Sequence, residues 1–438
     1  MISSTIATNS PPQVDAKHVL VIGGGVIGAM CALELSHAGC QVTIVEKERW
    51  GAACSHGNCG YVSPSHVLPL AQPGTIRKTL KQMFQANSPF AIKPRLSWQA
   101  LQWFLKFAGR CNQRDMLDAA RGNHAMLQSS KELYQRWVSQ GLECQWQEVG
   151  NLFVFEHQRD FEAFADTERL IQQNFGVAAT PLPTQQLVEL EPAIKPVVAG
   201  AWYYQGDCHL RPDLLMSGLR TLLENRNVSI LENCEVKGLI ADAQTIRAVE
   251  IVGDTIEADQ FVVAMGAWTP FMNRQLGCKI PIQPGKGYSL TMPAPEKMPK
   301  IPIIFEDTHV AITPLHDKYR IGSTMEFVGY NTTIHRKRLN LLKASAERYL
   351  VDPLCEPIEE EWFGWRPMTY DSLPIIDRSP AWSNVWICSG HSMLGISMAT
   401  GSGKLLREML LGETPHLDTS HYSLKRFTKK PFSERRIK

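Results

Sequence analysis

Short apolar runs rich in β-branched residues stand at three widely separated places in the chain, and each runs into glycine. HVLVI at 18–22 precedes a glycine loop, FVVAM at 261–265 precedes Gly266, and VWICS at 385–389 precedes Gly390. Such runs are typical of parallel strands covered on both faces. The pattern predicts an α/β domain whose sheet is assembled from distant segments.

The first run opens a complete strand–helix–strand unit. Apolar positions through Met30, Leu33 and Leu35 follow a helical spacing that ends at Gly39, a typical C-terminal cap, and QVTIV at 41–45 predicts the next strand. The loop between the first strand and the helix is GGGVIG, residues 23–28. This G-x-G-x-x-G spacing, in this context, is typical of dinucleotide binding.

Each glycine has a physical task in that interpretation. Gly23 permits the tight turn, Gly25 lets backbone amides approach a pyrophosphate at the helix N-terminus, and Gly28 lets the helix pack close to the strand. Glu46 ends the second strand and is placed to accept hydrogen bonds from a ribose 2′-hydroxyl. A carboxylate there argues against a 2′-phosphorylated nucleotide, but the fingerprint does not separate FAD from NAD.

The remaining segments predict a second, more antiparallel domain. GNLFVFE at 150–156, AITPL at 311–315 and YRIGSTMEF at 319–327 have strand patterns, whereas 75–142 is largely helical in pattern. We assign the nucleotide-binding domain to 17–66, 207–278 and 365–415. The second domain takes 67–206 and 279–364, with a helical insertion at about 74–142 and a basic tail at 416–438.

Composition excludes few classes of function. A net charge of +2 gives no general attraction to nucleic acid, although the last 18 residues hold seven Lys/Arg against Glu434. No second cysteine pair accompanies Cys54 and Cys59, so we expect reduced thiols and no metal site. No signal peptide or membrane span is recognisable. We expect a cytoplasmic protein, soluble or peripheral on the membrane.

The insertion leaves two interpretations open. Basic residues alternate there with Trp98, Trp103, Phe104, Leu105 and Phe107. Aromatic residues at helical spacing usually face a core. The alternative is a membrane-interface surface with Lys/Arg at the lipid headgroups and aromatic rings at the acyl boundary.

One arginine stands in a segment that otherwise reads as buried. Arg366 lies in FGWRPMTYDSLPIID, residues 363–377, and a guanidinium is rarely buried unless an anion meets it. The partner is either a structural carboxylate, Asp371 or Asp377, or a substrate anion. A planar fork in a dry aromatic environment suits a carboxylate.

Several ordered motifs across about 17–428 together resemble the FAD-dependent D-amino-acid oxidase/dehydrogenase superfamily, most closely its bacterial D-amino-acid dehydrogenases. They are VIGGGVIG, SHGNCGYVSPS, VVAMGAWT, IQPGKGYSLT, YRIGSTMEFVGY, WFGWRPMTYDSLPIID and SGHSMLGISMATGSGKL. The resemblance implies an FAD-binding Rossmann-like domain interleaved with an α+β substrate domain, as in glycine oxidase. Ser372 and Asp377 depart from the family, which more often has glycine at both positions.

The resemblance also implies the site. FAD contacts fall on Gly23, Gly25, Val26, Ile27, Gly28, Glu46, Lys47, Ser55, Asn58, Cys59, Gly60, Val236, Ala264, Gly266, Gly390, Met393, Leu394, Gly395 and Ile396. Arg366 would clamp the substrate carboxylate. Tyr288 and His391 are further catalytic candidates, although a strand tyrosine is commonly core and a loop histidine is commonly only hydrogen-bonded. His56 is an equally open case, and Lys286 is expected to be solvated.

The activity implied is oxidative deamination of a D-amino acid to a 2-oxo acid and ammonia, by hydride transfer from Cα to flavin N5, with a membrane quinone as electron acceptor. The D preference rests on the resemblance alone. The alternatives are a cyclic or secondary amine donor (D-hydroxyproline, proline or sarcosine), an oxidase that uses O2, and a protein in which FAD is not catalytic.

Overall fold

The computed structural model describes residues 17–77, 90–92 and 98–427. Its first sheet has the order β19–β20–β13–β1–β2–β9, and all neighbours are parallel except β19 and β20. The strands are β1 His18–Ile22, β2 Gln41–Val45, β9 Ser229–Leu231, β13 Gln260–Val263, β19 Ile375–Arg378 and β20 Val385–Ser389. The strands predicted at 18–22, 41–45, 261–265 and 385–389 are confirmed within two residues.

Successive residues of β1 serve opposite faces of this sheet. Val19 and Val21 join the apolar cluster formed with α1 (Val26–His37), α7 (Pro212–Glu224) and α9 (Gly395–Leu411). Leu20 and Ile22 join the cluster beneath the antiparallel meander β10 (Gly238–Asp242), β11 (Thr245–Ile251) and β12 (Asp254–Glu257). This double coverage explains the uninterrupted apolar run.

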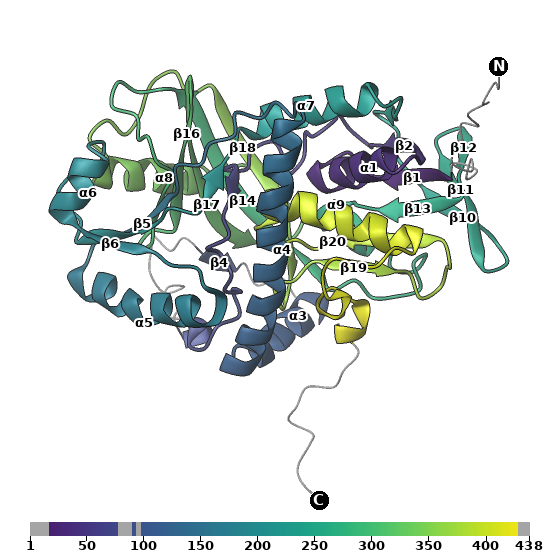
Figure 1. The fold of residues 1–438 in the computed structure, drawn as a ribbon, viewed down its shortest axis with the longest axis horizontal. Helices are drawn as coiled ribbons and strands as arrows, with labels where there is room; N and C mark the ends of the chain where they lie inside the picture. Colours follow the sequence, from purple (N-terminus) through teal and green to yellow (C-terminus); the bar gives the residue numbers. More distant parts are fainter. Residues whose placement is uncertain (1–16, 78–89, 93–97, 428–438) are drawn as a thin grey trace, which may run out of the picture.

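The second sheet has the order β18–β14–β17–β16–β15–β5–β7–β6, with β4 beside β17. Its strands are β4 Phe90–Ile92, β5 Asn151–Phe155, β6 Thr180–Pro183, β7 Gly200–Tyr204, β14 Ile282–Pro293, β15 Ile303–Phe305, β16 Val310–Leu315, β17 Lys318–Phe327 and β18 Glu360–Thr369. Helix α8 (Arg336–Tyr349) packs on β14 and β17, and α5 (Gln158–Phe175) on β5 and β7. Helix α6 (Thr184–Leu190) lies beside β6 and β7. Figure 1 shows the two sheets side by side, with the long α4 (Gln113–Ser139) crossing between them.

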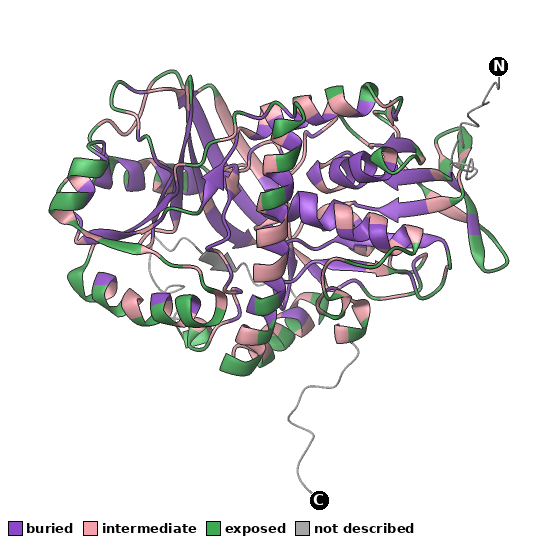
Figure 2. Cartoon of the chain, in the orientation of Figure 1, coloured by how far each residue is buried: buried purple, intermediate pink, exposed green. Residues whose placement is uncertain are grey.

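Strand β18 and helix α4 do not follow the predicted domain boundaries. The boundary between 364 and 365 falls inside β18. Helix α4, which we assigned to the second domain, packs on α9 and shares the apolar cluster of β1, because Met126, Leu127 and Trp137 point to that side. Figure 2 shows buried residues along the strands of both sheets.

Helix α3 (Trp98–Arg110) divides its aromatic residues between core and surface. Trp103 is buried, stacks with Phe107, and donates from its indole nitrogen to Pro281 O at 3.0 Å. Trp98, Leu101 and Leu105 are exposed by 68%, 48% and 61%. The core interpretation is confirmed for Trp103, whereas Trp98, Leu101 and Leu105 face solvent and the membrane-interface interpretation stays a prediction. Among the described residues, no helix combines the length and apolar character that a membrane crossing requires.

Candidate active site

The glycine loop after β1 is enforced by backbone contacts. Gly23 has φ +116°, and a Cβ there would lie 2.5 Å from Ala264 O. A Cβ on Gly28 would lie 1.9 Å from Gly23 O. Neither position accepts a side chain, so the loop closes tightly and the N-terminus of α1 faces the space beyond the sheet.

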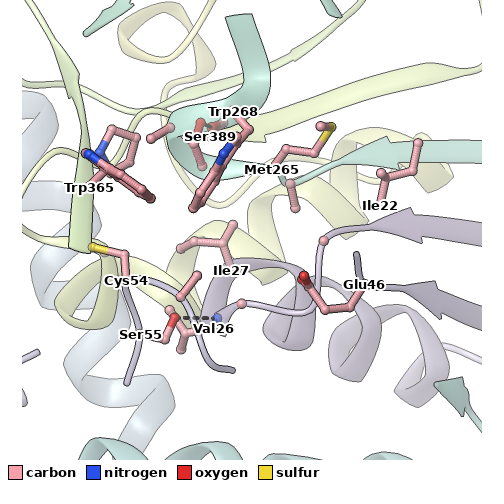
Figure 3. A pocket seen from close by; sticks show the side chains of 18 of the residues that line it. Ile22, Val26, Ile27, Glu46, Cys54, Ser55, Met265, Trp268, Trp365 and Ser389 are labelled. Atoms are coloured by element: carbon pink, nitrogen blue, oxygen red, sulfur yellow. Dashed lines mark hydrogen bonds between the residues drawn. The ribbon is translucent and has the colours of Figure 1, made fainter. Parts of the chain in front are cut away.

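That space is a cavity of about 500 Å³. Figure 3 shows Met265, Trp268 and Trp365 on one side of it, facing Ile27, Glu46 and Cys54 on the other. Most of the predicted FAD contacts line it: Gly23, Gly25, Val26, Ile27, Glu46, Lys47, Ser55, Asn58, Val236, Ala264, Gly266, Met393, Gly395 and Ile396. Gly28, Gly60 and Gly390 lie outside the lining and shape the surrounding loops, whereas Cys59 and Leu394 line a neighbouring cavity.

Glu46 is held in place at one end of the cavity. Its Oε2 accepts from Gly24 N at 2.7 Å and its Oε1 from Glu48 N at 3.0 Å. Both oxygens are thereby oriented, with lone pairs left for ribose hydroxyls. Trp268 and Trp365 form an aromatic wall on one side of the cavity. Lys47 Nζ lies 4.1 Å from the centre of a Trp268 ring and is therefore beside this wall.

The loop 54–60 forms another side. Ser55 Oγ accepts from Val26 N at 3.0 Å and so caps the first turn of α1, as the dashed line in Figure 3 marks. The loop is held from behind by Arg320, which is 3% exposed. Its Nη1 donates to His56 O at 3.0 Å and to Asn58 O at 2.7 Å, and its Nε donates to Thr291 Oγ1.

Arg366 faces both this cavity and a second one of about 270 Å³. Its Nη1 donates to Thr324 O at 2.7 Å, the one hydrogen bond of this guanidinium within the described residues. The guanidinium lies over Gly287, where a Cβ would be 2.6 Å from Cζ. Burial lowers the pKa of Arg366, yet an arginine stays charged, so its surroundings favour an incoming anion.

Neither carboxylate proposed as its structural partner is available. Asp371 Oδ2 accepts from Arg426 Nε at 2.9 Å, and Asp377 Oδ2 accepts from Ser423 Oγ and Leu424 N. Over the ranges 17–77, 90–92 and 98–427, Arg366 forms no salt bridge. Among the described residues, neither Asp371 nor Asp377 pairs with Arg366, and the role of its guanidinium toward a ligand anion stays a prediction.

Tyr288 and Arg366 project from different faces of the second sheet. In the β14–β18 pairing Gly285 stands opposite Arg366 and Tyr288 opposite Phe363, so the two side chains leave opposite faces of the sheet. The Tyr288 hydroxyl donates to Glu326 Oε2 at 2.7 Å, and the side chain is 1% exposed. The Tyr288 hydroxyl is therefore engaged within the protein, although the residue lines the second cavity together with Arg366, and its contact with the substrate stays a prediction.

Three further predictions concern polar side chains. His391 lines the first cavity, but its Nε2 lies 2.9 Å from Ser402 Oγ and the residue is 2% exposed. His56 Nε2 pairs with Glu360 Oε1 at 2.7 Å behind the loop. Lys286, expected to be solvated, is fully buried and donates to Thr333 O at 2.6 Å. The geometry gives His391 and His56 positioning contacts within the protein.

Sequence reasoning gave no site role to several residues that line the cavities. Cys54, Trp268 and Trp365 line the first, and His66 with Ser63 the second. Trp365 directly precedes Arg366, and Cys54 directly precedes Ser55. This adjacency to predicted site residues was the local indication that they line the cavity. His66 lies in the same glycine- and serine-rich loop as Ser55, but the elements that bring it to the second cavity are far apart in sequence.

The residues present fit a dinucleotide. The glycines leave room where a Cβ would collide, Glu46 stands at one end for a ribose, and Figure 3 places the aromatic wall and Cys54 toward the other end. Helix α1 directs amides toward the middle, where a pyrophosphate would lie. Arg366 borders the far end and the second cavity.

Comparison with known proteins agrees with this architecture. Residues 18–409 match the family model described as FAD dependent oxidoreductase. The chain is 30% identical over 426 residues to a D-amino acid dehydrogenase of Granulibacter bethesdensis, which covers 93% of this chain and 99% of that protein. It is 31% identical over 424 residues to a D-amino acid dehydrogenase of Methylobacterium radiotolerans, with 94% and 99% covered.

Two solved structures show the same fold at lower identity. Glycine oxidase from Geobacillus kaustophilus aligns with a TM-score of 0.72 at 20% identity, covering 94% of this chain and 99% of that one. L-proline dehydrogenase from P. horikoshii aligns with a TM-score of 0.70 at 21% identity, covering 94% and 98%. The predicted Rossmann-like fold of the glycine oxidase type is confirmed, and FAD is the cofactor. This chain belongs to the family of FAD-dependent oxidoreductases.

Proposed function

We propose that this protein oxidises the α-carbon of a D-amino acid and releases a 2-oxo acid and ammonia. The observation that carries the proposal is Arg366, a half-buried guanidinium that borders both cavities and has no carboxylate partner in the described chain. The names of the two relatives support the D-amino-acid class. FAD, when bound, supplies the acceptor for the hydride.

The protein's own residues would do the positioning. Arg366, held by Thr324 O and seated over Gly287, takes the substrate carboxylate with its planar fork. The second cavity, walled partly by Trp362, Met325 and Leu70, takes the side chain. Fixing the carboxylate and the side chain orients Cα–H toward the first cavity, and such orientation is a large part of catalysis.

The test is an anaerobic screen for loss of the oxidised flavin spectrum in the purified holoenzyme. Its panel holds D- and L-amino acids, glycine, sarcosine and hydroxyproline isomers. Bleaching by D-amino acids that is lost in Arg366→Ala, weakened in Arg366→Lys and retained in the distant Arg348→Ala supports the proposal. Bleaching only by hydroxyproline or sarcosine would replace the substrate class, and peroxide release in air would replace the acceptor. No bleaching by any amine would refute amine oxidation.

We further propose a quinone-type acceptor reached from a membrane surface. Trp98, Leu101 and Leu105 form an exposed apolar stripe at positions i, i+3 and i+7 of α3. Lys425 and Arg426 are the described basic residues of the tail, and Arg426 contacts this helix because its backbone oxygen accepts from Arg110 Nη2 at 3.5 Å. An apolar stripe next to a basic segment suits an anionic bilayer surface, and on this proposal the enzyme is peripheral on the cytoplasmic side.

A further inference from the structure

The second cavity includes a histidine with a buried carboxyl behind it. Strand β3 (Tyr61–Val62) pairs with β8 (Cys208–His209), and this pairing sets Asp207 against the segment that follows β3. His66 lies in that segment and lines the second cavity together with Arg366. Asp207 itself is 2% exposed and is outside the cavity lining.

Ser65 connects the two groups. Its backbone nitrogen donates to Asp207 Oδ1 at 3.0 Å, and its hydroxyl donates to Asp207 Oδ2 at 2.5 Å. The same hydroxyl oxygen lies 3.5 Å from His66 Nδ1. Because the hydroxyl proton points to Asp207, the oxygen is left to accept from Nδ1–H, and Nε2 is then the acceptor nitrogen of a neutral ring.

The protonation states of His66 and Asp207 suit transfer of a proton from the second cavity to Asp207. Burial raises the pKa of Asp207 to about 7, although the hydrogen bonds from the Ser65 hydroxyl and backbone nitrogen oppose the rise. Burial lowers the pKa of His66 to about 4, so the ring is neutral near pH 7. Lys131 is the nearby cation, and its Nζ donates to Gly206 O. Tyr204 and Cys208, the other titratable neighbours of Asp207, are neutral because burial raises their pKa values.

We propose that His66, Ser65 and Asp207 form the path that removes the proton of the substrate's α-ammonium group. The inference rests on the proposed function, in which that nitrogen must offer a lone pair to form the C=N bond as hydride leaves Cα. His66 is the proton acceptor, and Ser65 and Asp207 are positioning and relay residues.

The transfer balances without another reactant. The N–H bond of the substrate breaks as His66 Nε2 gains that proton. His66 Nδ1 gives its proton to Ser65 Oγ, and Ser65 Oγ gives its own to Asp207 Oδ2. The product is a neutral imidazole in the other tautomer and a neutral buried carboxyl. The accepted proton is then held on Asp207, outside the second cavity and away from the lone pair of the substrate nitrogen.

Glu306 and His309 also line the second cavity, from the turn between β15 and β16. The choice of His66 over these groups rests on the buried acceptor that stands behind it, which would let the ring return to its neutral state within one turnover. Glu306→Gln and His309→Gln are therefore comparison variants in the test.

The test measures the rate of flavin reduction by the best amine substrate against pH, in rapid-mixing experiments on holoenzymes. A positioned base typically contributes about 10²–10⁴-fold. We expect His66→Gln to lose at least about 10²-fold near pH 7 and Asp207→Asn and Ser65→Ala to lose less. All three should recover at a pH where the free substrate has already lost its ammonium proton. Ser379→Ala, which removes a buried hydroxyl bonded to Leu276 O, should be unaffected.

A second readout needs no turnover. An amino acid with two substituents on Cα has no hydride to give, so 2-aminoisobutyrate can bind without reaction. Difference infrared spectra at pH 8 should show a protonated carboxyl appearing on binding to the wild type and to Glu306→Gln, and none in Asp207→Asn.

The outcomes separate the inference from the proposed function. If no amine bleaches the wild-type flavin, the proposed function fails first. Suppose instead that amines bleach the wild-type flavin, while each of the three variants shows a loss of rate that does not change with pH, or no loss of rate. Either result would show that the relay is wrong. A loss in Glu306→Gln that high pH restores would assign the proton to Glu306 instead. If Asp207→Asn does not fold, Ser65→Ala and His66→Gln decide the matter through the same profile.

Discussion

Gly287→Ala is the sharpest test of how the carboxylate site is built. A Cβ at this position would lie 2.6 Å from Arg366 Cζ and Nη2 and 2.8 Å from Nη1. Carbon atoms in contact prefer about 3.5–4.0 Å, so the guanidinium must move by roughly 1 Å. A displacement of that size at a reacting geometry costs about 10²-fold in rate.

We therefore expect Gly287→Ala to lower kcat/KM for the amino-acid substrate by about 10²-fold, equivalent to about 2.7 kcal/mol of transition-state stabilisation. FAD content and Tm should stay close to wild type, because Gly287 does not line the first cavity and the displaced group is the end of a flexible side chain. The assay is anaerobic flavin reduction over a range of substrate concentrations. Saturation curves then separate KM from kcat.

The matched control is Gly238→Ala on β10, where the nearest atom to a new Cβ is Glu250 Oε2 at 3.4 Å. Wild-type kinetics in Gly287→Ala would refute the conclusion that the Arg366 guanidinium packs directly over Gly287. An equal loss in both variants would show that the effect belongs to strand glycines in general.

Four other predictions follow from the contacts described. Arg320→Gln should weaken FAD binding by about tenfold or more, measured by flavin release on dilution, because the carbonyls of the 54–60 loop lose a charged donor. Glu46→Gln should weaken it less, since the amide keeps one acceptor oxygen; an unchanged affinity would contradict the ribose assignment. Asp207 binds its proton more tightly in the folded protein than in the unfolded chain. The free energy of unfolding should therefore fall as pH rises from about 4 to about 7. The difference between 3.8 and about 7 is worth on the order of 4 kcal/mol, and denaturant titrations of Asp207→Asn should lack this slope. Leu105→Glu should reduce co-sedimentation with anionic vesicles and leave flavin reduction by substrate intact, whereas binding equal to wild type would refute the α3 surface.

Much of the nucleotide end could be predicted because its signals are local. The strand at 18–22, the turn at Gly23 and the acid at Glu46 lie within thirty residues, and each follows from backbone sterics or burial. Arg366 was identifiable for a different reason, since a permanent charge in an apolar segment requires an anion.

What could not be predicted depends on pairings between distant segments. The face that the Tyr288 side chain occupies could not be predicted, because it is fixed by the register with Phe363, 75 residues away in the numbering, and a one-residue change of register reverses it. Ser65 and Asp207 meet only because β3 pairs with β8. No spacing rule in the sequence connects such positions.

The strand order of the first sheet also has a consequence for biosynthesis. β1 emerges from the ribosome early, yet its neighbour β13 begins at Gln260 and the next strand, β20, ends at Ser389. The glycine loop at 23–28 is therefore synthesised long before β13 and β20, and before the residues after these strands that form the opposite side of the FAD cavity. FAD capture should be a late event in synthesis, and nascent chains that end before Ser389 should depend on chaperones to protect the exposed faces of β1 and β2.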